Sequence, residues 1–580
     1  MDFVNIKIND TPLQVPSGTT ILEAAKQINV KIPTLCHLNL EGFGIVNQVS
    51  SCRVCMVEAV GRPTLVTACS ELVYEGLEVR TDSLKAINAR RMAVELLLSN
   101  HPKDCLVCPK NLDCDLQSLA NELGVREIRY EGEMMAYEKD VSSYSIVKDP
   151  NKCVMCRRCE TMCNEVQTCN ILSAVNRGFD VFVGPAFNMD MADSSCTFCG
   201  QCVAVCPTAA LTEVNYTRRV WEALADEETH VVVQVAPAIR VAIGEEFGME
   251  AGSVTTGQLA ASLRKLGFDG IFDTDFAADL TIMEEASELV HRIKHGGTLP
   301  MLTSCCPAWV KFFEHQFPDM LDIPSTCKSP QIMFGAIAKT YYAEKKKIDP
   351  KKIRVVSIMP CVAKKAEASR PELTKDDNSN VDVVITTREF ATMLKEAGID
   401  FSKLEPSKFD TILGESTGAG VIFGATGGVI EAATRTAYEW ITGETLESVD
   451  FHALRGIEGL REASVQVGDL TLNIGIAHGL GNARKLLEDI RSGKSKYHAI
   501  EIMACPGGCV GGGGQPYHHG DMSIIEKRRQ AIYKEDAGMA RRKSHENKEI
   551  IALYEEYLGE PYGKKAHELL HTKYEPKEKI

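Results

Sequence analysis

The sequence predicts a multidomain protein of the α+β and α/β classes, in which small cysteine-rich domains precede one larger domain with parallel β-sheets. The chain has 580 residues, which at the usual domain size corresponds to about three to five domains. Sixteen of its 22 cysteines occur before residue 207. From about residue 230, apolar runs alternate with helical patterns, as in α/β units.

Charge and composition narrow the class of protein. The formal net charge is −15, from 64 basic and 79 acidic residues, and this argues against a nucleic-acid partner. The opening MDFVNIKIND does not have the pattern of a signal peptide, and we find no apolar run of about 18 residues that could span a membrane. We therefore expect a cytoplasmic protein, whose cysteines are metal ligands or catalytic residues rather than disulfides.

The first predicted domain covers residues 1–80. FVNIKIND and TPLQV alternate like a two-stranded hairpin with Asn9 and Asp10 at the turn, and SGTTILEAAKQINV has helical periodicity behind a cap region at Ser17 and Thr19. Four thiolates on a small sheet-plus-helix domain suit a [2Fe–2S] cluster, although they would also satisfy a tetrahedral zinc ion. The four cysteines are Cys36, Cys52, Cys55 and Cys69.

The second predicted domain, residues 81–125, contains HPKDCLVCPKNLDC. Its candidate ligands are His101, Cys105, Cys108 and Cys114. One imidazole and three thiolates can hold a [4Fe–4S] cluster, whose charge differs from that of an all-thiolate cluster because histidine is neutral. An isolated histidine is more often a surface or core residue, but three cysteines follow this one within thirteen residues.

The third predicted domain, residues 140–215, has a doubled motif typical of two-cluster ferredoxins. KCVMCRRCETMCN and SCTFCGQCVAVCP each carry three closely spaced cysteines and a fourth one turn later, and this fourth cysteine reaches the other cluster. The two predicted [4Fe–4S] ligand sets are Cys153, Cys156, Cys159 and Cys206, and Cys196, Cys199, Cys202 and Cys163. Cys169 is left over, and we expect a buried, inert thiol. Four clusters in series indicate an electron relay toward a redox site in the second half.

The second half, residues 216–542, is predicted to be an α/β domain. Apolar runs such as IRVVSIMP, VDVVITT and AIEIMAC alternate with helical stretches such as AIRVAIGEEFGM and REFATMLKEAG, and Thr386-x-x-Glu389 reads as a capping box. Ligands in such folds lie beyond the carboxyl ends of strands. Cysteines follow several of these runs: Cys305, Cys306, Cys361, Cys505 and Cys509.

Other features of the second half carry no assigned chemistry. GAGVIFGATGG lacks the third glycine of a dinucleotide fingerprint, because Phe423 takes its place, and no P-loop is present. We interpret its glycines, and those of GGCVGGGGQP, as close contacts with a bulky cofactor or with backbone. Cys327 is expected to be an inert thiol.

Three segments, TSCCPAW, IMPCVAKKAEASRP and MACPGGCVGGGGQP, together resemble the three signatures of the [FeFe]-hydrogenases. The N-terminal modules match the long, clostridial kind in type and order. The resemblance implies a β-grasp [2Fe–2S] domain, a [4Fe–4S] domain with one histidine and three cysteine ligands, a two-cluster ferredoxin domain and an α/β H-cluster domain with parallel sheets. The implied reaction is the reversible reduction of two protons to H₂.

The resemblance also implies roles for the late cysteines. Cys306, Cys361, Cys505 and Cys509 would hold a [4Fe–4S] cubane, and Cys509 would bridge to a two-iron unit with CO, cyanide and a bridging dithiolate amine. Cys305 would exchange protons with that amine. The alternative is that Cys305 is simply a small buried hydrophobe.

A proton route and a cofactor pocket follow from the same resemblance. The route would comprise Glu285, Glu288, Arg292 and Ser325, although two glutamates three apart on a helix are also typical of a solvated face. Lys364 would donate to a cyanide ligand. The remaining pocket residues would be Met359, Met503 and Phe423 as an apolar wall, with Pro330 and Gln331 near the cofactor, all of which ordinary core packing also explains.

At one position the chain departs from the pattern of the clostridial [FeFe]-hydrogenases, and this departure points to a subgroup of the family. Ala238 follows Pro237 where ferredoxin-linked clostridial enzymes carry a hydroxyl, and with CPAW this resembles the catalytic subunits of multimeric, NAD-linked, electron-bifurcating hydrogenases. NAD chemistry would then belong to NADH-oxidising flavin and iron–sulfur partner subunits, with ferredoxin as a further partner. Alternatives are a monomeric ferredoxin hydrogenase, an electron-transfer subunit like the large iron–sulfur subunit of complex I, which residues 1–121 resemble, and a hydrogenase-like assembly protein.

The C-terminal segment, residues 543–580, has an amphipathic helical pattern and a second short element. It resembles the small-subunit portion of the same family. We expect His545, His567 and His571 to be packing or surface residues rather than ligands.

Overall fold

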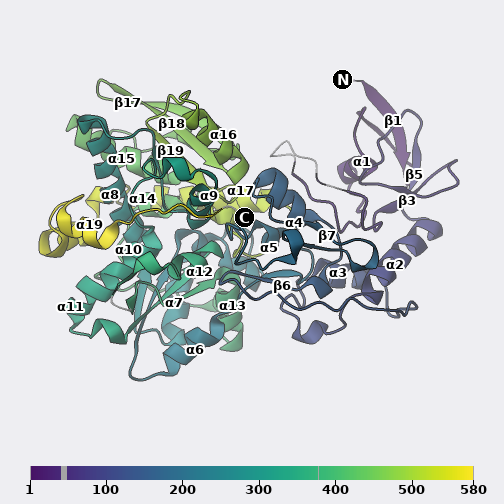
Figure 1. Ribbon diagram of the computed structural model, residues 1–580. Helices are drawn as coiled ribbons and strands as arrows, with labels where there is room; N and C mark the ends of the chain where they lie inside the picture. The colour runs from purple at the N-terminus through teal and green to yellow at the C-terminus, as the bar shows by residue number, and fades with distance from the viewer. Residues whose placement is uncertain (1, 41–46, 48, 376–377, 579–580) are drawn as a thin grey trace.

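The computed structural model describes residues 2–40, 47, 49–375 and 378–578. Residues 1, 41–46 and 48 of the predicted first domain lie outside the described residues, as do residues 376–377 of the predicted 216–542 domain and residues 579–580 of the last segment. The N-terminal sheet lies at one end of the molecule, the cysteine-rich segments follow, and both four-stranded sheets belong to the larger body beyond them (Figure 1).

The N-terminal domain has a five-stranded sheet in the order β2-β1-β5-β3-β4. The predicted hairpin of β1 and β2 is confirmed, with Asn9 and Asp10 at positive φ in its turn. Helix α1 (Ile21–Gln27) is also present, but its cap is Thr20, which forms a capping box with Glu23, and the predicted cap at Ser17 and Thr19 was wrong. The strands are β1 (Phe3–Ile8), β2 (Thr11–Pro16), β3 (Met56–Ala59), β4 (Val66–Thr67) and β5 (Glu78–Arg80).

The next two cysteine-rich regions contain short elements. Helices α2 (Leu84–Ser99) and α3 (Asp115–Glu122) flank the 3₁₀ turn η2 (Cys105–Val107). Farther on, β6 (Ile146–Lys148) pairs with β9 (Leu211–Glu213), and β7 (Ser173–Val175) pairs with β8 (Phe182–Gly184). The first four-cysteine motif contains α4 (Arg158–Thr161), which continues as η4 (Met162–Val166). The second contains α5 (Gln201–Val205).

The first sheet of the predicted 216–542 domain is fully parallel, in the order β11-β10-β13-β16. Its central strands are buried on both faces, as continuous apolar runs predict. The predicted capping box of Thr386 and Glu389 opens α13 (Thr387–Glu396). The strands are β10 (His230–Val235), β11 (Gly270–Asp273), β13 (Ile353–Met359) and β16 (Val383–Thr386), and α7 (Thr256–Leu266) contacts β11.

One predicted helix of this domain was wrong. AIRVAIGEEFGM forms two 3₁₀ helices, η7 (Pro237–Val241) and η8 (Ile243–Phe247), rather than one α-helix. Ala242 has φ −129° and ψ −38° between them, and Gly248 ends the second turn at φ 76°. The apolar periodicity of the stretch therefore reflects burial of a bent segment, which the sequence pattern does not distinguish from a helix.

The second sheet has the order β12-β19-β18-β17 and is mixed rather than parallel. β12 (Met301–Leu302), β19 (Ala499–Met503) and β18 (Leu470–His478) are parallel, but β17 (Leu460–Val467) pairs antiparallel with β18. The two residues between β17 and β18 are Gly468 and Asp469, and Gly468 has φ 58°. A two-residue turn with positive φ closes a hairpin, so the sheet gains an antiparallel edge.

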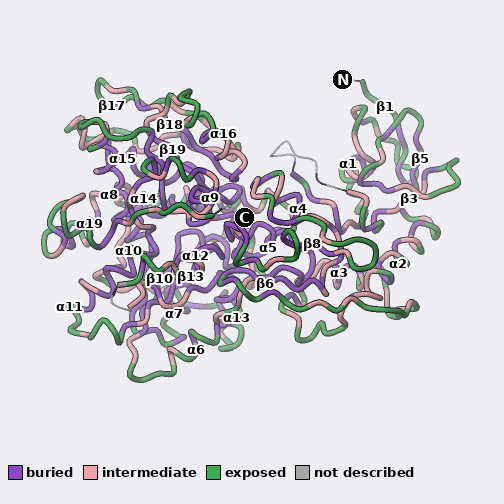
Figure 2. The backbone as a smooth tube through the Cα atoms, in the orientation of Figure 1, coloured by how far each residue is buried: buried purple, intermediate pink, exposed green. Residues whose placement is uncertain are grey.

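Helix α8 (Thr274–His295) runs through the centre of the catalytic domain, and α10 (Pro330–Ile337) and α15 (Gly428–Thr442) pack against it. Figure 2 shows the buried backbone concentrated in these elements and in the sheets. Helix α12 (Ala363–Ala368) follows β13, and α16 (Leu480–Arg491) follows β18. Among the described helices, none is both long and apolar enough to cross a membrane.

The predicted helical segment and short element of residues 543–580 are present as α18 (Lys548–Leu553), η18 (Tyr554–Leu558) and α19 (Lys564–Leu570), and α17 (Met522–Gly538) precedes them. α18 contacts α8, and α19 contacts α10. The segment therefore covers the central helices of the catalytic domain.

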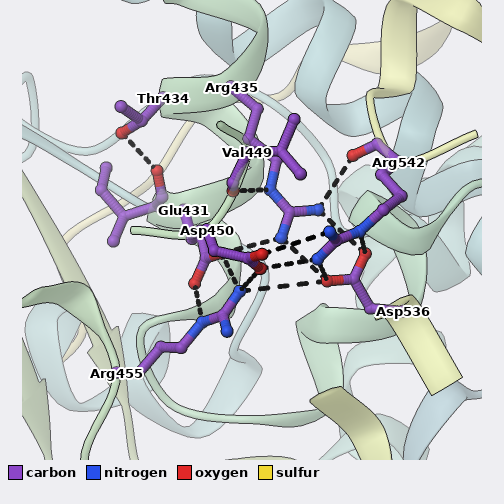
Figure 3. Close-up of polar contacts among 9 residues, drawn as sticks. Glu431, Thr434, Arg435, Val449, Asp450, Arg455, Asp536 and Arg542 are labelled. Atoms are coloured by element: carbon purple, nitrogen blue, oxygen red, sulfur yellow. Dashed lines mark hydrogen bonds and ion pairs between the residues drawn. The ribbon is translucent and has the colours of Figure 1, made fainter. Parts of the chain in front are cut away.

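A buried ion network joins α15 to α17 and to the segment that follows it (Figure 3). Asp536 accepts hydrogen bonds from Arg435 at 2.9 and 3.0 Å and from Arg542 at 2.6 and 3.0 Å. Arg455 bonds both Glu431 and Asp450. The three cations and three anions of this network balance, which is what burial of charge requires.

Candidate functional site

The late cysteines gather at the carboxyl ends of strands, as predicted. Cys305 and Cys306 follow β12, Cys361 follows β13, and Cys505 follows β19. Cys509 begins the short turn η16 (Cys509–Gly511). The sheet edges thus bring segments about 200 residues apart in sequence to one place.

Four of these thiols influence one another. Burial raises the pKa of Cys509 to about 12, and Cys306 adds to the shift. The pKa of Cys505 is also raised, first by burial and then by Cys361 and Cys306. Buried thiols in apolar surroundings stay protonated unless a cation or metal takes the proton's place. The donor set of Cys306, Cys361, Cys505 and Cys509 therefore fits a thiolate-ligated metal cluster.

The neighbouring thiols Cys305 and Cys306 occupy different surroundings. Cys306 Sγ accepts a hydrogen bond from the Ala504 N–H at 3.5 Å and packs on the apolar cluster of Trp309. Cys305 packs on the other cluster, which contains Phe423. Burial raises its pKa well above the usual range, and Glu285 is the next cause. The two adjacent side chains therefore lie in different surroundings.

Lys364 lies beside Cys305. Its buried ammonium donates to the Cys305 carbonyl at 3.1 Å and to Glu367 at 2.8 Å. Burial would lower its pKa, but Glu367 outweighs burial and raises it. Gln331 donates to the same Glu367 at 3.0 Å, and its Oε1 has no hydrogen-bond partner among the described residues. A buried cation and an unsatisfied acceptor are consistent with a polar ligand beside Cys305.

The predicted apolar wall is present as buried side chains. Ala238, Phe423 and Met503 belong to one apolar cluster, whereas Met359 packs in the cluster of the first sheet. A Cβ on Gly508 would lie 2.6 Å from the Thr426 nitrogen and 3.0 Å from Met503 Sδ, so the Gly508 backbone packs directly against Thr426 and Met503. Pro237 begins η7 and Pro330 begins α10, and Gln515 donates to the Ala238 carbonyl at 2.9 Å.

The predicted proton-route residues lie along α8 and the loop before α10. Ser304 donates to Glu285 at 3.4 Å, and burial raises the pKa of Glu285 to about 8. Ser325 donates to Glu288 Oε2 at 2.8 Å. Arg292 donates to Glu288 Oε1 at 2.6 Å. Glu285 and Glu288 are 1% exposed, so the solvated-face interpretation was wrong for this pair.

In the N-terminal domain the four predicted ligands meet. The Sγ atoms of Cys55 and Cys69 are 3.3 Å apart. Hydrogen bonds from Cys52 and then Cys69 lower the pKa of the Cys36 thiol, so this thiol lies close to both of them. Four converging thiols fit a metal or a [2Fe–2S] cluster.

The second group centres on His101. Burial, helped by Lys152, lowers its pKa to about 4, and its Nδ1 lacks a partner within the described part of the chain. A neutral, buried and unsatisfied imidazole nitrogen fits a ligand better than a core residue. Cys108 accepts a hydrogen bond from Lys152 at 3.4 Å, Cys114 contacts the Pro207 carbonyl at 3.6 Å, and Cys105 is exposed.

The doubled motif lines two small cavities. One is lined by the thiols of Cys153, Cys156, Cys159 and Cys206. The other is lined by those of Cys163, Cys196, Cys199 and Cys202, together with Cys169. This distribution has the exchanged fourth cysteine that the spacing predicts.

The cysteine groups form a continuous series. Cys36 and Cys156 share an apolar cluster, which joins the first domain to the doubled motif. Cys159 and Cys202 interact across the two cavities. Cys199 in turn contributes to the raised pKa of Cys505. The series therefore ends at the late cysteines of the second half.

Sequence reasoning missed several polar residues of this region. Ser304 precedes Cys305 and bonds Glu285, and Glu367 bonds Lys364 three residues away on α12. The i,i+3 spacing of Lys364 and Glu367 is a signal that could have found the pair. Tyr574 donates to the Ser325 carbonyl at 2.6 Å from a segment 249 residues away, for which the sequence carries no local signal.

Family models match along most of the chain. Residues 229–513 match the iron only hydrogenase large subunit, C-terminal domain, and residues 522–577 match the iron hydrogenase small subunit. Residues 2–83 match a 2Fe-2S iron-sulfur cluster binding domain, and residues 193–212 match a 4Fe-4S binding domain. Residues 90–129 match the NADH-ubiquinone oxidoreductase-G iron-sulfur binding region. The protein therefore has iron–sulfur domains of both cluster types and a hydrogenase H-cluster domain.

Relatives that align with nearly the whole chain agree with these family models. The chain is 59% identical to the NADP-reducing hydrogenase subunit HndD of Solidesulfovibrio fructosivorans, over 100% of both chains. It is 40% identical to iron hydrogenase 1 of Clostridium pasteurianum, over 98% of this chain and 99% of that one. A solved variant of the [FeFe]-hydrogenase HydA1 from Chlamydomonas reinhardtii superposes with a TM-score of 0.57 at 44% identity, covering 63% of this chain and 99% of that chain. The chain belongs to the [FeFe]-hydrogenase large-subunit family and is an iron hydrogenase, an oxidoreductase that acts on H₂.

Proposed function

We propose that the chain is the catalytic subunit of a multimeric hydrogenase that couples H₂ to NAD(P) and ferredoxin by electron bifurcation. The observation that carries the H₂ chemistry is the meeting of four clustered thiols with the separate, partly buried thiol of Cys305 at the end of a continuous cysteine series. The partner assignment draws support from the similarity to a subunit named as NADP-reducing and from Ala238 in the pocket.

The proposed cofactors are one [2Fe–2S] cluster, three accessory [4Fe–4S] clusters and an H-cluster, consistent with the cysteine groups described above. The proposed domains are residues 1–80, 81–125, 140–215, 216–542 and 543–580. The proposed accessory ligands are Cys36, Cys52, Cys55 and Cys69, then His101, Cys105, Cys108 and Cys114, then Cys153, Cys156, Cys159 and Cys206, and finally Cys163, Cys196, Cys199 and Cys202. The proposed H-cluster ligands are Cys306, Cys361, Cys505 and Cys509.

When bound, the H-cluster supplies a Lewis-acidic iron and a base that together cleave or form H₂ heterolytically. The protein's own residues move and hold protons. Cys305 gives a proton to the pocket or takes one from it, and Glu285, which is protonated at neutral pH, is the carboxyl next to Cys305. Ser325 and Glu288 continue the route, and Arg292 holds the Glu288 carboxylate at its outer end.

The pocket residues orient the cofactor and exclude water. Lys364 places a cation beside Cys305, where it can donate to an anionic ligand. Phe423, Met503 and Met359 keep the site apolar, which strengthens each polar contact inside it. Ala238 offers no side-chain hydrogen bond, so the cofactor's potential differs from that beside a hydroxyl residue.

The proposed setting is a reducing cytoplasm, where the thiols stay available for metal. Matured full-length protein should evolve H₂ from a reduced dye and show infrared bands of metal-bound CO and cyanide. A correctly matured sample without these bands would overturn the H₂ chemistry itself. The matched control is Cys306→Ser, which should lose both the bands and the activity.

The bifurcating context is tested by purification from native cells. Recovery of NADH-oxidising flavin and iron–sulfur subunits with the chain supports it. A solitary chain that exchanges electrons with ferredoxin alone would support the second candidate, a monomeric ferredoxin hydrogenase, which the similarity to iron hydrogenase 1 along nearly the whole chain favours.

A further inference from the structure

Arg292 is the residue at the outer end of the proposed carboxylate route. Arg292 donates from Nε and Nη2 to Glu288 Oε1 and gives its other N–H groups to the carbonyls of Thr298, Ile323 and Pro324. A guanidinium does not give up its proton in a protein. Arg292 can therefore position Glu288, but it cannot pass protons to it.

The other oxygen of the Glu288 carboxylate faces a different set of residues. Oε2 accepts from the Ser325 hydroxyl at 2.8 Å and from the Thr326 N–H at 3.1 Å, and the Thr326 hydroxyl lies 3.4 Å away. That hydroxyl is 2.7 Å from Nδ1 of His571. Ligand atoms of Glu288, Cys327 and His571 lie within 4.8 Å of one another. One hydroxyl thus separates an imidazole from the carboxylate.

The tautomer of His571 is set from its other side. Nε2 of the ring lies 3.0 Å from Glu284 Oε2, which also accepts the Tyr562 N–H at 2.9 Å, and Tyr554 donates to Oε1 of the same carboxylate. Since Glu284 is an acceptor at this position, Nε2 carries a hydrogen and Nδ1 is the atom that gains or loses a proton. Nδ1 is the nitrogen that faces Thr326.

The C-terminal segment holds this ring in place beside a surface depression. Backbone hydrogen bonds of 2.7 Å join Lys328 to Leu570 and Thr572 to Thr326, on either side of a bridge between Cys327 and His571. His571 also borders an open surface depression, together with Glu568 and Lys573. The imidazole, whose side chain is 3% exposed, therefore lies beside this depression and one hydroxyl away from Glu288.

We propose that His571 is the proton-exchanging residue at the outer end of the route, acting on Glu288 through the Thr326 hydroxyl. The proposal rests on the proposed hydrogenase function. In the inward step, protonated His571 gives its Nδ1 proton to the Thr326 oxygen while the Thr326 hydroxyl proton passes to Glu288 Oε2. The net change converts imidazolium and carboxylate to imidazole and carboxylic acid, with no electron transferred, and H₂ uptake uses the reverse step.

The groups that face His571 come from several elements. Glu284 and Glu288 approach from α8, Cys327 from the loop before α10, Tyr554 from η18, and Tyr562 and His567 from the C-terminal segment itself. His567 stacks on His571 with ring centroids 4.0 Å apart. Burial, and then His571, lower the pKa of His567. Glu284 and Glu288 are therefore the acidic neighbours of His571, and His567 is a titratable neighbour on the same segment.

The test uses matured full-length protein and the H₂ evolution rate from about pH 5 to 9, the range in which histidine titrates. We expect His571→Gln to lower the rate about 100-fold, the lower end of the usual contribution of an acid–base group, and to remove the limb of the pH profile that His571 provides. Added imidazole should restore activity to His571→Ala. Cluster iron and CO bands should be unchanged in both variants.

Controls separate a relay role from a structural one. Thr326→Val should lower the H₂ evolution rate as His571→Gln does, whereas Thr326→Ser, which keeps the hydroxyl, should keep the wild-type rate. If the His571 variants do not fold, this pair of Thr326 variants tests the relay role. His545→Gln, in the same segment but bonded to Glu439, should behave as the wild type. An unchanged pH profile in His571→Gln, or equal rates for the two Thr326 variants, overturns the proposal. If the matured wild type evolves no H₂, the proposed function fails instead.

Discussion

Gly200 and Gly513 meet backbone to backbone at the junction between the doubled cysteine motif and the catalytic domain. A Cβ on Gly200 would lie 3.3 Å from the Gly513 Cα and 2.3 Å from Val362 Cγ2, and Gly200 has a φ of +73°. Gln201 adds a hydrogen bond of 3.1 Å to the Gly511 carbonyl. This close approach lies next to Cys199, which interacts with Cys306, and in our proposal it joins the electron relay to the site.

Gly200→Ala should therefore weaken the junction. The positive φ costs an alanine about 1–2 kcal/mol, and the overlap with Val362 adds to it. We expect a lower melting temperature and slower H₂ evolution with electrons supplied by reduced ferredoxin. Gly178→Ala is the matched control, because Gly178 has a φ of +66° and open space around it. Equal effects of the two substitutions would mean that backbone strain alone, and not the junction, is responsible.

The two adjacent cysteines should respond differently to replacement by serine. Cys305→Ser should lose most turnover while keeping its iron and its CO and cyanide bands, because the thiol exchanges protons and binds no metal in our proposal. Cys306→Ser should lose cubane iron. Iron analysis and infrared spectroscopy of the matured variants check this. Loss of iron in the Cys305 variant would show that the two roles are exchanged.

Glu285→Gln should abolish proton transfer and change the pH dependence of stability. Turnover should fall by at least about 100-fold, the usual contribution of an acid–base group. The pKa of Glu285 is raised to about 8 in the folded protein, so folding favours its protonated form. The wild type should therefore lose stability relative to the glutamine variant as the pH rises from about 4.5 to 8.

The measurement for this linkage is the unfolding midpoint of the cluster-free proteins at both ends of the pH window. At the acid end, where Glu285 is protonated in both the folded and the unfolded state, the two proteins should be similarly stable. A difference that does not grow with pH would contradict the raised pKa. Retained turnover in the glutamine variant would remove Glu285 from the route.

Asp536→Asn should strongly destabilise the catalytic domain. Asp536 bonds Arg435 and Arg542, and its side chain is 0% exposed, so the substitution leaves buried guanidinium charge without its partner. We expect a loss of roughly 3–5 kcal/mol. The control is Asp319→Asn, which breaks an ion pair whose side chains are about half exposed, with an expected cost of at most about 1 kcal/mol. Denaturant unfolding of both variants measures the difference, and similar costs would argue against the network as a stabilising element.

His101→Ala should lose the iron of one [4Fe–4S] cluster, whereas His101→Cys should keep the cluster and lower its reduction potential, because a thiolate adds negative charge. Electron paramagnetic resonance during a redox titration separates these outcomes. His452, which is exposed, is the control position and should tolerate alanine. An unaltered set of cluster signals in His101→Ala would show that the buried imidazole is a core residue.

Much of the site could be predicted because its information is local. In a Cys-x2-Cys motif the spacing itself brings two thiols to one metal, so the accessory groups were recognisable before any tertiary contact was known. The strands of the first sheet were recognisable because burial on both faces requires continuous apolar runs. The hairpin of β17 and β18 was missed, although its Gly468-Asp469 turn is a local signal.

The sequence by itself determined which cysteines form groups, the order of those groups along the chain and the strand ends that carry the catalytic thiols. Only the tertiary structure decided that Thr326, His571 and Glu284 meet, since 245 residues separate Thr326 from His571. The physical reason is that ligands a few residues apart are held close together by the chain itself. The contact of α19 with the α8 and α10 region instead depends on how separate apolar faces pack. No periodicity along the chain encodes that packing, so the histidine at the outer end of the route becomes visible only in the folded protein.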